Sequence, residues 1–148
     1  MIVLGIDPGC GHTGWAVVDA KRRLILAIDT IRGKSSSTTC ERLAGVAVIH
    51  EPHLIAVQNP IGNGRVPRFH KGDKSGIALA KNVELSALIL GYLQGQGRPV
   101  VSVKPLRGTG NKMKRKDWQL YWQWTGRTSQ DARDAAQIAL QAVKEGRT

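Results

Sequence analysis

Four side chains of types that bind metal ions occupy positions where chemistry could be assembled. Asp7 and Gln58 each close an apolar run, while Asp131 and Asp134 stand three residues apart in a segment of helical periodicity and so share a helix face. Close carboxylates repel each other, and a hard divalent cation, Mg²⁺ or Mn²⁺, relieves that repulsion. Two such ions could activate water and stabilise the leaving oxygen in phosphodiester hydrolysis. Taken singly, each acid is more simply a turn or helix-cap residue.

These side chains can meet only if the apolar runs form one sheet. Hydrophobic periodicity predicts strands at 2–7, 14–18, 23–31, 53–57 and 99–103, and helices at 38–51, 75–94, 114–124 and 129–144. Thr38 and Glu41 have the spacing of a capping box, which places the start of the first helix at Thr38. The order predicts an α/β fold in a single domain, 1–148, with a five-stranded mixed sheet of antiparallel meander and parallel crossovers flanked by helices. Parallel neighbours ending at Asp7 and Gln58 would bring both side chains to one edge.

The charge balance indicates the partner. The chain has 22 Lys and Arg against 11 Asp and Glu, a net charge of +11 and a pI near 10.3, as expected for a protein that binds a polyanion. Nucleic acid is favoured over a membrane surface, because no basic amphipathic helix is evident. The sequence predicts neither a leader nor an apolar stretch near the roughly 18 residues of a membrane span, and the two distant cysteines fit a reducing cytoplasm.

Two basic regions are candidates for DNA contacts. The segment 59–74 is long for a connection in a compact domain; it carries one phenylalanine, Phe69, which could stack on an unpaired base or equally anchor the segment to the domain. The basic residues of that segment are Arg65, Arg68, Lys71 and Lys74. A second cluster precedes the helix at 114–124 and consists of Lys112, Lys114, Arg115 and Lys116. The aromatic face that follows it, Trp118, Tyr121 and Trp122, is expected in the core or a subunit contact rather than on DNA.

Two motifs resemble those of a known family over nearly the whole chain. Gly5-Ile6-Asp7-Pro8-Gly9, followed by Thr13-Gly14-Trp15, and Asp131-Ala132-Arg133-Asp134-Ala135-Ala136 are similar to the opening and closing motifs of RuvC-type Holliday junction resolvases. The resemblance implies an RNase H-like fold and a cytoplasmic homodimer that uses magnesium to nick opposing strands of four-way junctions in DNA recombination and repair. It also implies that Asp7, Asp131 and Asp134 are catalytic acids. Lys116 is the first candidate for a lysine near the scissile phosphate, and Lys114 is the second. Arg107 is the candidate for a further DNA contact.

Gln58 departs from the family pattern, which has a glutamate as fourth acid at this position. An amide offers one neutral oxygen where a carboxylate offers two charged ones, so metal affinity and activity should fall. Gln58 indicates either a naturally inactive relative or a deliberate exchange; because every other matching position is intact, we favour the exchange. The alternatives to an endonuclease are a junction-binding protein that does not cleave and, ranked lowest, an RNA-processing nuclease of the YqgF type.

Overall fold

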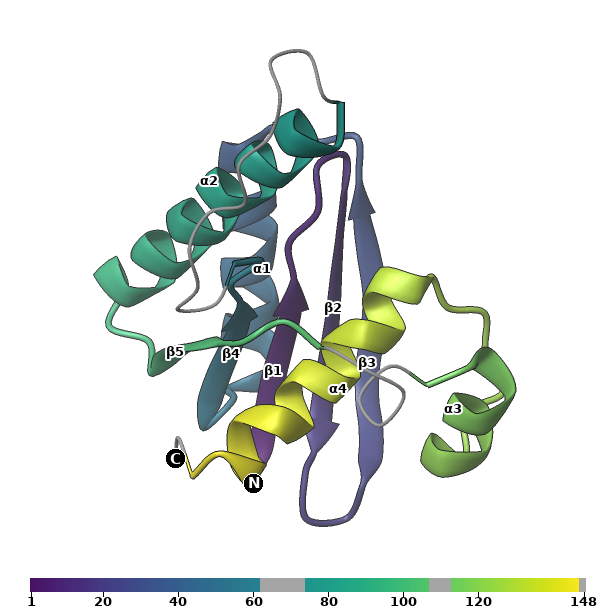
Figure 1. The fold of residues 1–148 in the computed structure, drawn as a ribbon. Coiled ribbons are helices and arrows are strands. Elements are labelled where there is room, and N and C mark those ends of the chain that lie inside the picture. Colours follow the sequence, from purple (N-terminus) through teal and green to yellow (C-terminus); the bar gives the residue numbers. More distant parts are fainter. Residues whose placement is uncertain (62–73, 107–112, 147–148) are drawn as a thin grey trace.

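The computed structural model describes residues 1–61, 74–106 and 113–146, which form one mixed sheet and four helices (Figure 1). The elements are β1 (Ile2–Asp7), β2 (His12–Asp19), β3 (Leu24–Arg32), α1 (Ser36–His50), β4 (Leu54–Gln58), α2 (Lys74–Gly95), β5 (Val100–Val103), α3 (Arg115–Trp122) and α4 (Gln130–Lys144). The strand order is β3-β2-β1-β4-β5. The predicted five-stranded mixed sheet is therefore confirmed.

The strand directions bring two chain-distant positions to the same edge of the sheet. β1, β2 and β3 form an antiparallel meander, whereas β4 runs parallel to β1 and β5 runs parallel to β4. In the parallel pair Ile6 lies opposite Val57, so the residues that follow them, Asp7 and Gln58, end their strands side by side. This is the juxtaposition that the two apolar runs predict.

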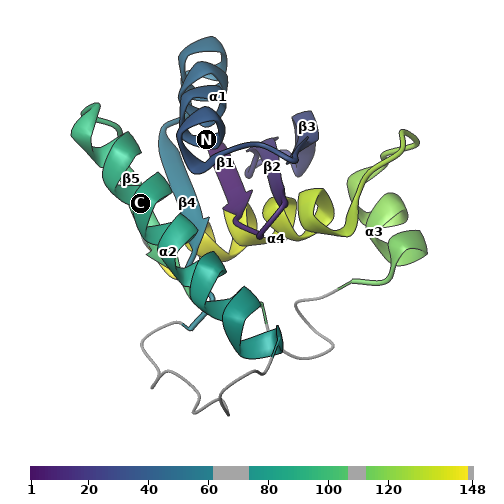
Figure 2. The same ribbon diagram turned by 90° about the horizontal axis from the view of Figure 1, so that it is seen from above.

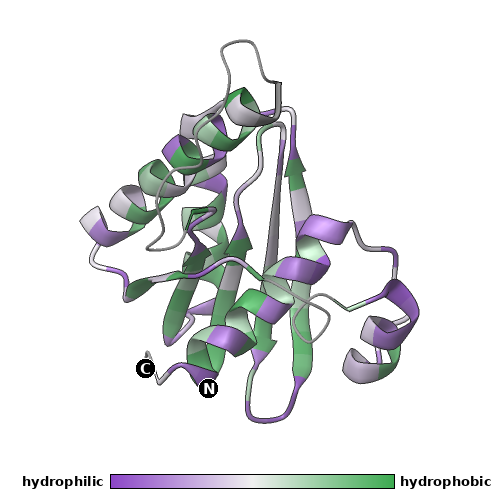
Figure 3. Cartoon of the chain, in the orientation of Figure 1, coloured by the Kyte–Doolittle hydropathy of each residue, from purple (hydrophilic) through white to green (hydrophobic). Residues whose placement is uncertain are grey.

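The sheet separates two helical layers. α1 and α2 cover one face and α4 covers the other, as the view from above shows (Figure 2). Side chains of β1 alternate accordingly: Leu4 and Ile6 join the core beneath α1 and α2, and Val3 joins the core beneath α4. Hydrophobic residues are concentrated in the strands between these layers (Figure 3). The alternation explains why β1 is apolar throughout its length.

α4 lies unusually close to β1 and β2. A Cβ atom on Gly5 would overlap the backbone oxygen of Ala135, and one on Gly14 would overlap the backbone of Asp131. Only glycine permits this approach, because any larger residue would push the helix away. The first turns of α4 are thus held against the strands next to Asp7.

Two expectations from the sequence were wrong. α1 begins at Ser36 with Ser35 as its cap, because the Ser35 hydroxyl accepts a hydrogen bond from the Thr38 N–H and so satisfies a donor of the first turn. The apolar content of α2 was also underestimated: Gly76–Gly95 is long enough to cross a membrane and has a mean hydropathy of 1.3. A single such helix is weak evidence for a span, and α2 packs against α1, β4 and β5.

Candidate active site

The strand-end residues Asp7 and Gln58 form a hydrogen-bonded pair. With the Gln58 amide oriented to satisfy both of its ends, its nitrogen donates to Asp7 Oδ1 at 3.0 Å and its oxygen accepts from the Leu106 N–H at 3.2 Å. The backbone oxygen of Gln58 accepts from the Ser86 hydroxyl of α2 at 2.6 Å. Gln58 is therefore fixed from three sides, and it presents a hydrogen-bond donor to the Asp7 carboxylate.

The glycine contact of α4 brings its acidic turn beside this pair. Gly14 lies opposite Asp7 in the β1–β2 ladder, and it packs against the backbone of Asp131. Asp134 is 5% exposed, and Asp131 is half-buried. The sequence places these acids on one face of the helix, with the other face in the core; in fact α4 is buried almost all round between residues 132 and 140. Asp134 is consequently shielded from solvent.

A small polar network orients Asp134. Gln130 Nε2 donates to Asp134 Oδ1 at 2.7 Å, and Arg133 donates from Nη2 to Gln130 Oε1 at 2.9 Å and from Nη1 to the Thr128 backbone oxygen at 2.8 Å. Burial, and then the positive charge of Arg115, lower the pKa of the Arg133 guanidinium, while Asp134 and Asp131 act in the opposite direction. Gln130 is not among the site residues predicted from the sequence, although it lies four residues before Asp134 and therefore on the same helix face.

The donor set fits a divalent cation only in part. Asp7, Asp131 and Asp134 supply the hard carboxylate oxygens that Mg²⁺ and Mn²⁺ prefer. Gln58 instead turns its N–H groups toward Asp7, and among the described residues no group of three or more His, Cys, Asp or Glu side chains is close enough to hold a metal ion. A glutamate at 58 would place a second charge against Asp7; the amide removes that repulsion.

The predicted DNA-contacting residues are only partly described. Arg65, Arg68, Phe69, Lys71, Arg107 and Lys112 lie outside the described residues, and Lys74 is the first residue of α2. The remaining basic candidates, Lys114, Arg115 and Lys116, are exposed at the beginning of α3. Their predicted roles stay predictions. The aromatic face behaves as expected, because Trp118 and Trp122 are each 1% exposed and belong to the core beneath α4.

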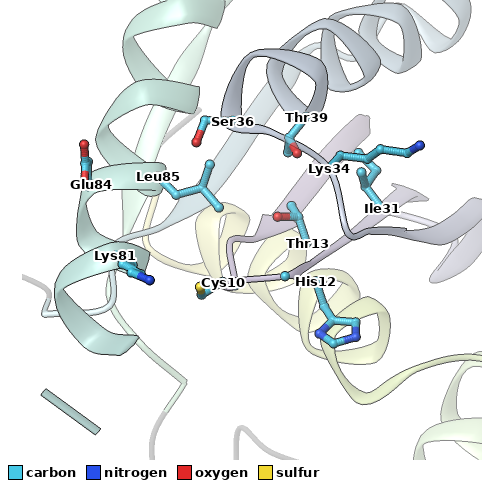
Figure 4. Close-up of a pocket in the computed structure, with 12 residues that line it drawn as sticks. Cys10, His12, Thr13, Ile31, Lys34, Ser36, Thr39, Lys81, Glu84 and Leu85 are labelled. Atoms are coloured by element: carbon cyan, nitrogen blue, oxygen red, sulfur yellow. The ribbon is translucent and has the colours of Figure 1, made fainter. Parts of the chain in front are cut away.

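A second polar feature lies immediately beyond Asp7 and was missed from the sequence. A cavity of about 200 Å³ is bounded by the turn at 9–13, by the first residues of α1 and by α2 (Figure 4). Its polar side chains include Ser36, Thr39, Lys81 and Glu84. These residues are separated along the chain and carry no common motif, so only the fold reveals that they are neighbours.

Comparisons with known proteins give a consistent family. The chain is 34% identical to the crossover junction endodeoxyribonuclease RuvC of Zymomonas mobilis over 125 residues, which cover 78% of this chain and 72% of that protein. It is 30% identical to the RuvC of Moorella thermoacetica over 115 residues, covering 72% of this chain and 63% of that protein. No protein-family model matches the chain.

The fold is shared with solved resolvases. The RuvC of Thermus thermophilus, in complex with a Holliday junction substrate, has a TM-score of 0.72 and 21% identity, with 99% of this chain and 95% of that chain covered. The fowlpox virus Holliday junction resolvase has a TM-score of 0.54 and 12% identity, with both chains fully covered. Nucleases of this fold generally depend on divalent metal ions. The strand-end pair, the α4 acids and the identity to the Zymomonas protein together show that this chain belongs to the RuvC family of crossover junction endodeoxyribonucleases.

Proposed function

We propose that this protein is a structure-selective DNA endonuclease that acts on four-way junctions and hydrolyses phosphodiester bonds in opposing strands. The observation that carries the proposal is the placement of Asp7 and Gln58 at neighbouring strand ends, with the acidic turn of α4 packed beside them, in a chain of the RuvC family. No observation favours an RNA substrate.

The proposed site uses carboxylates to hold the metal and basic side chains to hold DNA. Asp7, Asp131 and Asp134 are the proposed metal ligands, and these side chains must move closer together to share an ion, because no three such side chains among the described residues are close enough to hold one. Gln58 joins them only if its amide turns its oxygen inward. Two divalent ions, when bound, would supply an activated water and stabilise the leaving oxygen. Lys116 is the proposed contact to the scissile phosphate. The remaining proposed DNA contacts are Arg65, Arg68, Phe69, Lys71, Lys74, Arg107, Lys112, Lys114 and Arg115.

A protein that binds junctions without cutting them is the second candidate, and one observation favours it. The Gln58 amide donates to Asp7, so this edge of the site is satisfied without a cation. The protein as it stands should therefore bind junctions but cleave them poorly.

Nicking of opposing strands needs two sites, and we propose that the protein acts as a cytoplasmic homodimer. Large apolar side chains are exposed on the outer surface of the α1–α2 layer: Val48 and Ile49 on α1, and Ile77, Leu88 and Tyr92 on α2. Leu88 follows Ile77 by 11 residues and Tyr92 follows Leu88 by 4, so the three side chains lie on one side of the helix. A second copy covering this surface would remove it from water.

Sedimentation analysis of a paired substitution tests the dimer. Ile49→Ser with Leu88→Ser should shift the protein to monomer, whereas Leu120→Ser, which changes a 78% exposed leucine on α3, should not. A wild-type dimer that survives the paired substitution would exclude this surface as the interface.

Binding and cleavage assays on matched substrates test the proposed function. A four-way junction, a linear duplex of the same arms and a structured RNA should be compared for this protein and for Gln58→Glu, with and without magnesium. We expect both proteins to prefer the junction and only Gln58→Glu to cleave it efficiently. Equal binding to duplex and junction would contradict structure selectivity. Tight junction binding by an inert Gln58→Glu variant would instead support the non-cleaving candidate.

A further inference from the structure

The cavity beyond Asp7 contains polar groups that the nuclease proposal does not use. It lies between the turn at 9–13, which follows β1, the N-terminal end of α1 and the middle of α2. Asn82 of α2 joins this turn directly, because its Oδ1 accepts from the Cys10 N–H at 2.6 Å. The turn therefore borders both features, because it follows Asp7 directly in the chain and lines the cavity.

The hydroxyl groups of two largely buried threonines open onto this cavity. Thr13 is 2% exposed and Thr39 is 4% exposed, and both line the cavity. Within the described part of the chain neither hydroxyl forms a hydrogen bond, and both point into the space (Figure 4). Each hydroxyl can donate one hydrogen bond and accept others, so both are available to a ligand or water in the cavity.

The remaining groups around these hydroxyls favour a negative ligand. The Lys81 amino group and the Ser36 hydroxyl point inward, whereas Glu84 and Lys34 extend away from the space (Figure 4). The first turn of α1 contains no acidic residue, so its free N–H groups and the positive end of the helix dipole are not neutralised from within the helix. Hydroxyls, an ammonium group and a helix N-terminus are the donors that bind phosphate.

We propose that this cavity binds a phosphate group, held by Thr13, Ser36, Thr39 and Lys81. Because the turn joins the cavity to Asp7, the phosphate is one that neighbours the scissile phosphate on the same DNA strand. This assignment to DNA rests on the proposed nuclease function, whereas the anion site itself does not. By holding this phosphate, the cavity fixes the position of the DNA strand relative to the carboxylates.

Backbone-modified junctions provide the test for a DNA phosphate. Single methylphosphonates, which remove one charge, are placed in turn at the phosphates flanking the cleavage position, and junction affinity is measured for the wild type, Lys81→Gln and Thr39→Val. At one position the modification should weaken wild-type binding by about ten-fold, as expected for losing a charged hydrogen bond, and should cost Lys81→Gln almost nothing further. Lys21→Gln, a matched charge change in the β2–β3 turn, should keep the full wild-type response.

Inorganic phosphate, followed by amide chemical shifts of labelled protein, tests the anion site without DNA. We expect saturable chemical-shift changes at the start of α1, and Thr39→Val and Lys81→Gln should both weaken them. This result would support the anion site even if the protein binds no junction; in that case only the nuclease proposal fails. If the protein binds junctions but, at every methylphosphonate position, the affinity loss from the modification and the loss from the substitution simply multiply, the DNA assignment is overturned. If phosphate also produces no saturable shift at the cavity, the anion site is overturned.

Discussion

The two faces of the sheet differ in how closely their helices pack. On the α4 face the helix touches the strands through Gly5 and Gly14, and Asp134 is buried and hydrogen-bonded to Gln130. On the α1–α2 face a cavity of about 200 Å³ separates the turn after β1 from the two helices, and large apolar side chains reach solvent. The face that carries Asp131 and Asp134 is thus the tightly packed one, and the opposite face is the more open one.

Gln58 lies at the boundary between the faces, and its replacement should have the largest effect. Gln58→Glu should convert weak or absent junction cleavage into magnesium-dependent turnover. Without metal it should also lower stability by about 1 to 3 kcal/mol, because a carboxylate then faces Asp7 where an amide donated a hydrogen bond. Thermal unfolding with and without magnesium measures this loss, and magnesium should restore stability to the variant far more than to the wild type. An equal response of both proteins would show that position 58 does not contribute to the metal site.

Glycine substitutions compare the packing of the two faces. Gly5→Ala should destabilise the fold by about 2 to 3 kcal/mol in denaturant unfolding, because its methyl group meets the backbone of α4. Gly45→Ala, in the middle of α1 with nothing within 4 Å of the added atom, should stabilise by about 0.5 to 1 kcal/mol. Similar effects at both positions would contradict the difference in packing.

The hydrogen bond to Asp134 tests whether the acid face is rigid. Gln130→Ala should cost about 1 to 2 kcal/mol, because it leaves a buried carboxylate without one of its donors. Gln94→Ala, at an exposed position of α2, is the control and should change stability little. If the two substitutions are equivalent in urea unfolding, solvent reaches Asp134 more freely than its burial indicates.

Chemical modification of the two cysteines tests the α1–α2 face and should have the smallest effect on stability. Burial, with a smaller contribution from Glu41, raises the pKa of the Cys40 thiol, so little reactive thiolate is present at neutral pH. Cys10 is exposed in the turn beside the cavity. Iodoacetamide should modify Cys10 quickly and Cys40 only after unfolding, with almost no change in stability after the first reaction. If iodoacetamide modifies both thiols rapidly in the folded protein, α1 must open readily.

Local patterns predicted the strands and the neighbouring positions of Asp7 and Gln58, because the relevant signals are periodic and contiguous. A buried parallel strand needs an unbroken apolar run, so the ends of β1 and β4 identified Asp7 and Gln58 as neighbours. Helix starts were less certain because Ser35 and Thr38 are both good caps and only packing decides between them. The presence of Lys81 and Thr39 in one cavity could not be predicted, because the local sequence does not determine which turn of α2 lies beside α1.

The close packing of α4 on β1 also has a consequence for the order of assembly during synthesis. Residues 131–134 must reach strands that were made more than a hundred residues earlier, at the roughly 5 to 20 residues per second of translation. A nascent chain can pair β1 with β2 and β4 early, but its Gly5 and Gly14 surface stays bare until α4 leaves the ribosome. The proposed nuclease chemistry would thus be withheld from incomplete chains, because a product that stops before α4 lacks two of the three proposed acids, Asp131 and Asp134. Such a product also exposes an apolar sheet face, which would make it a substrate for chaperones and proteases rather than a partly active enzyme.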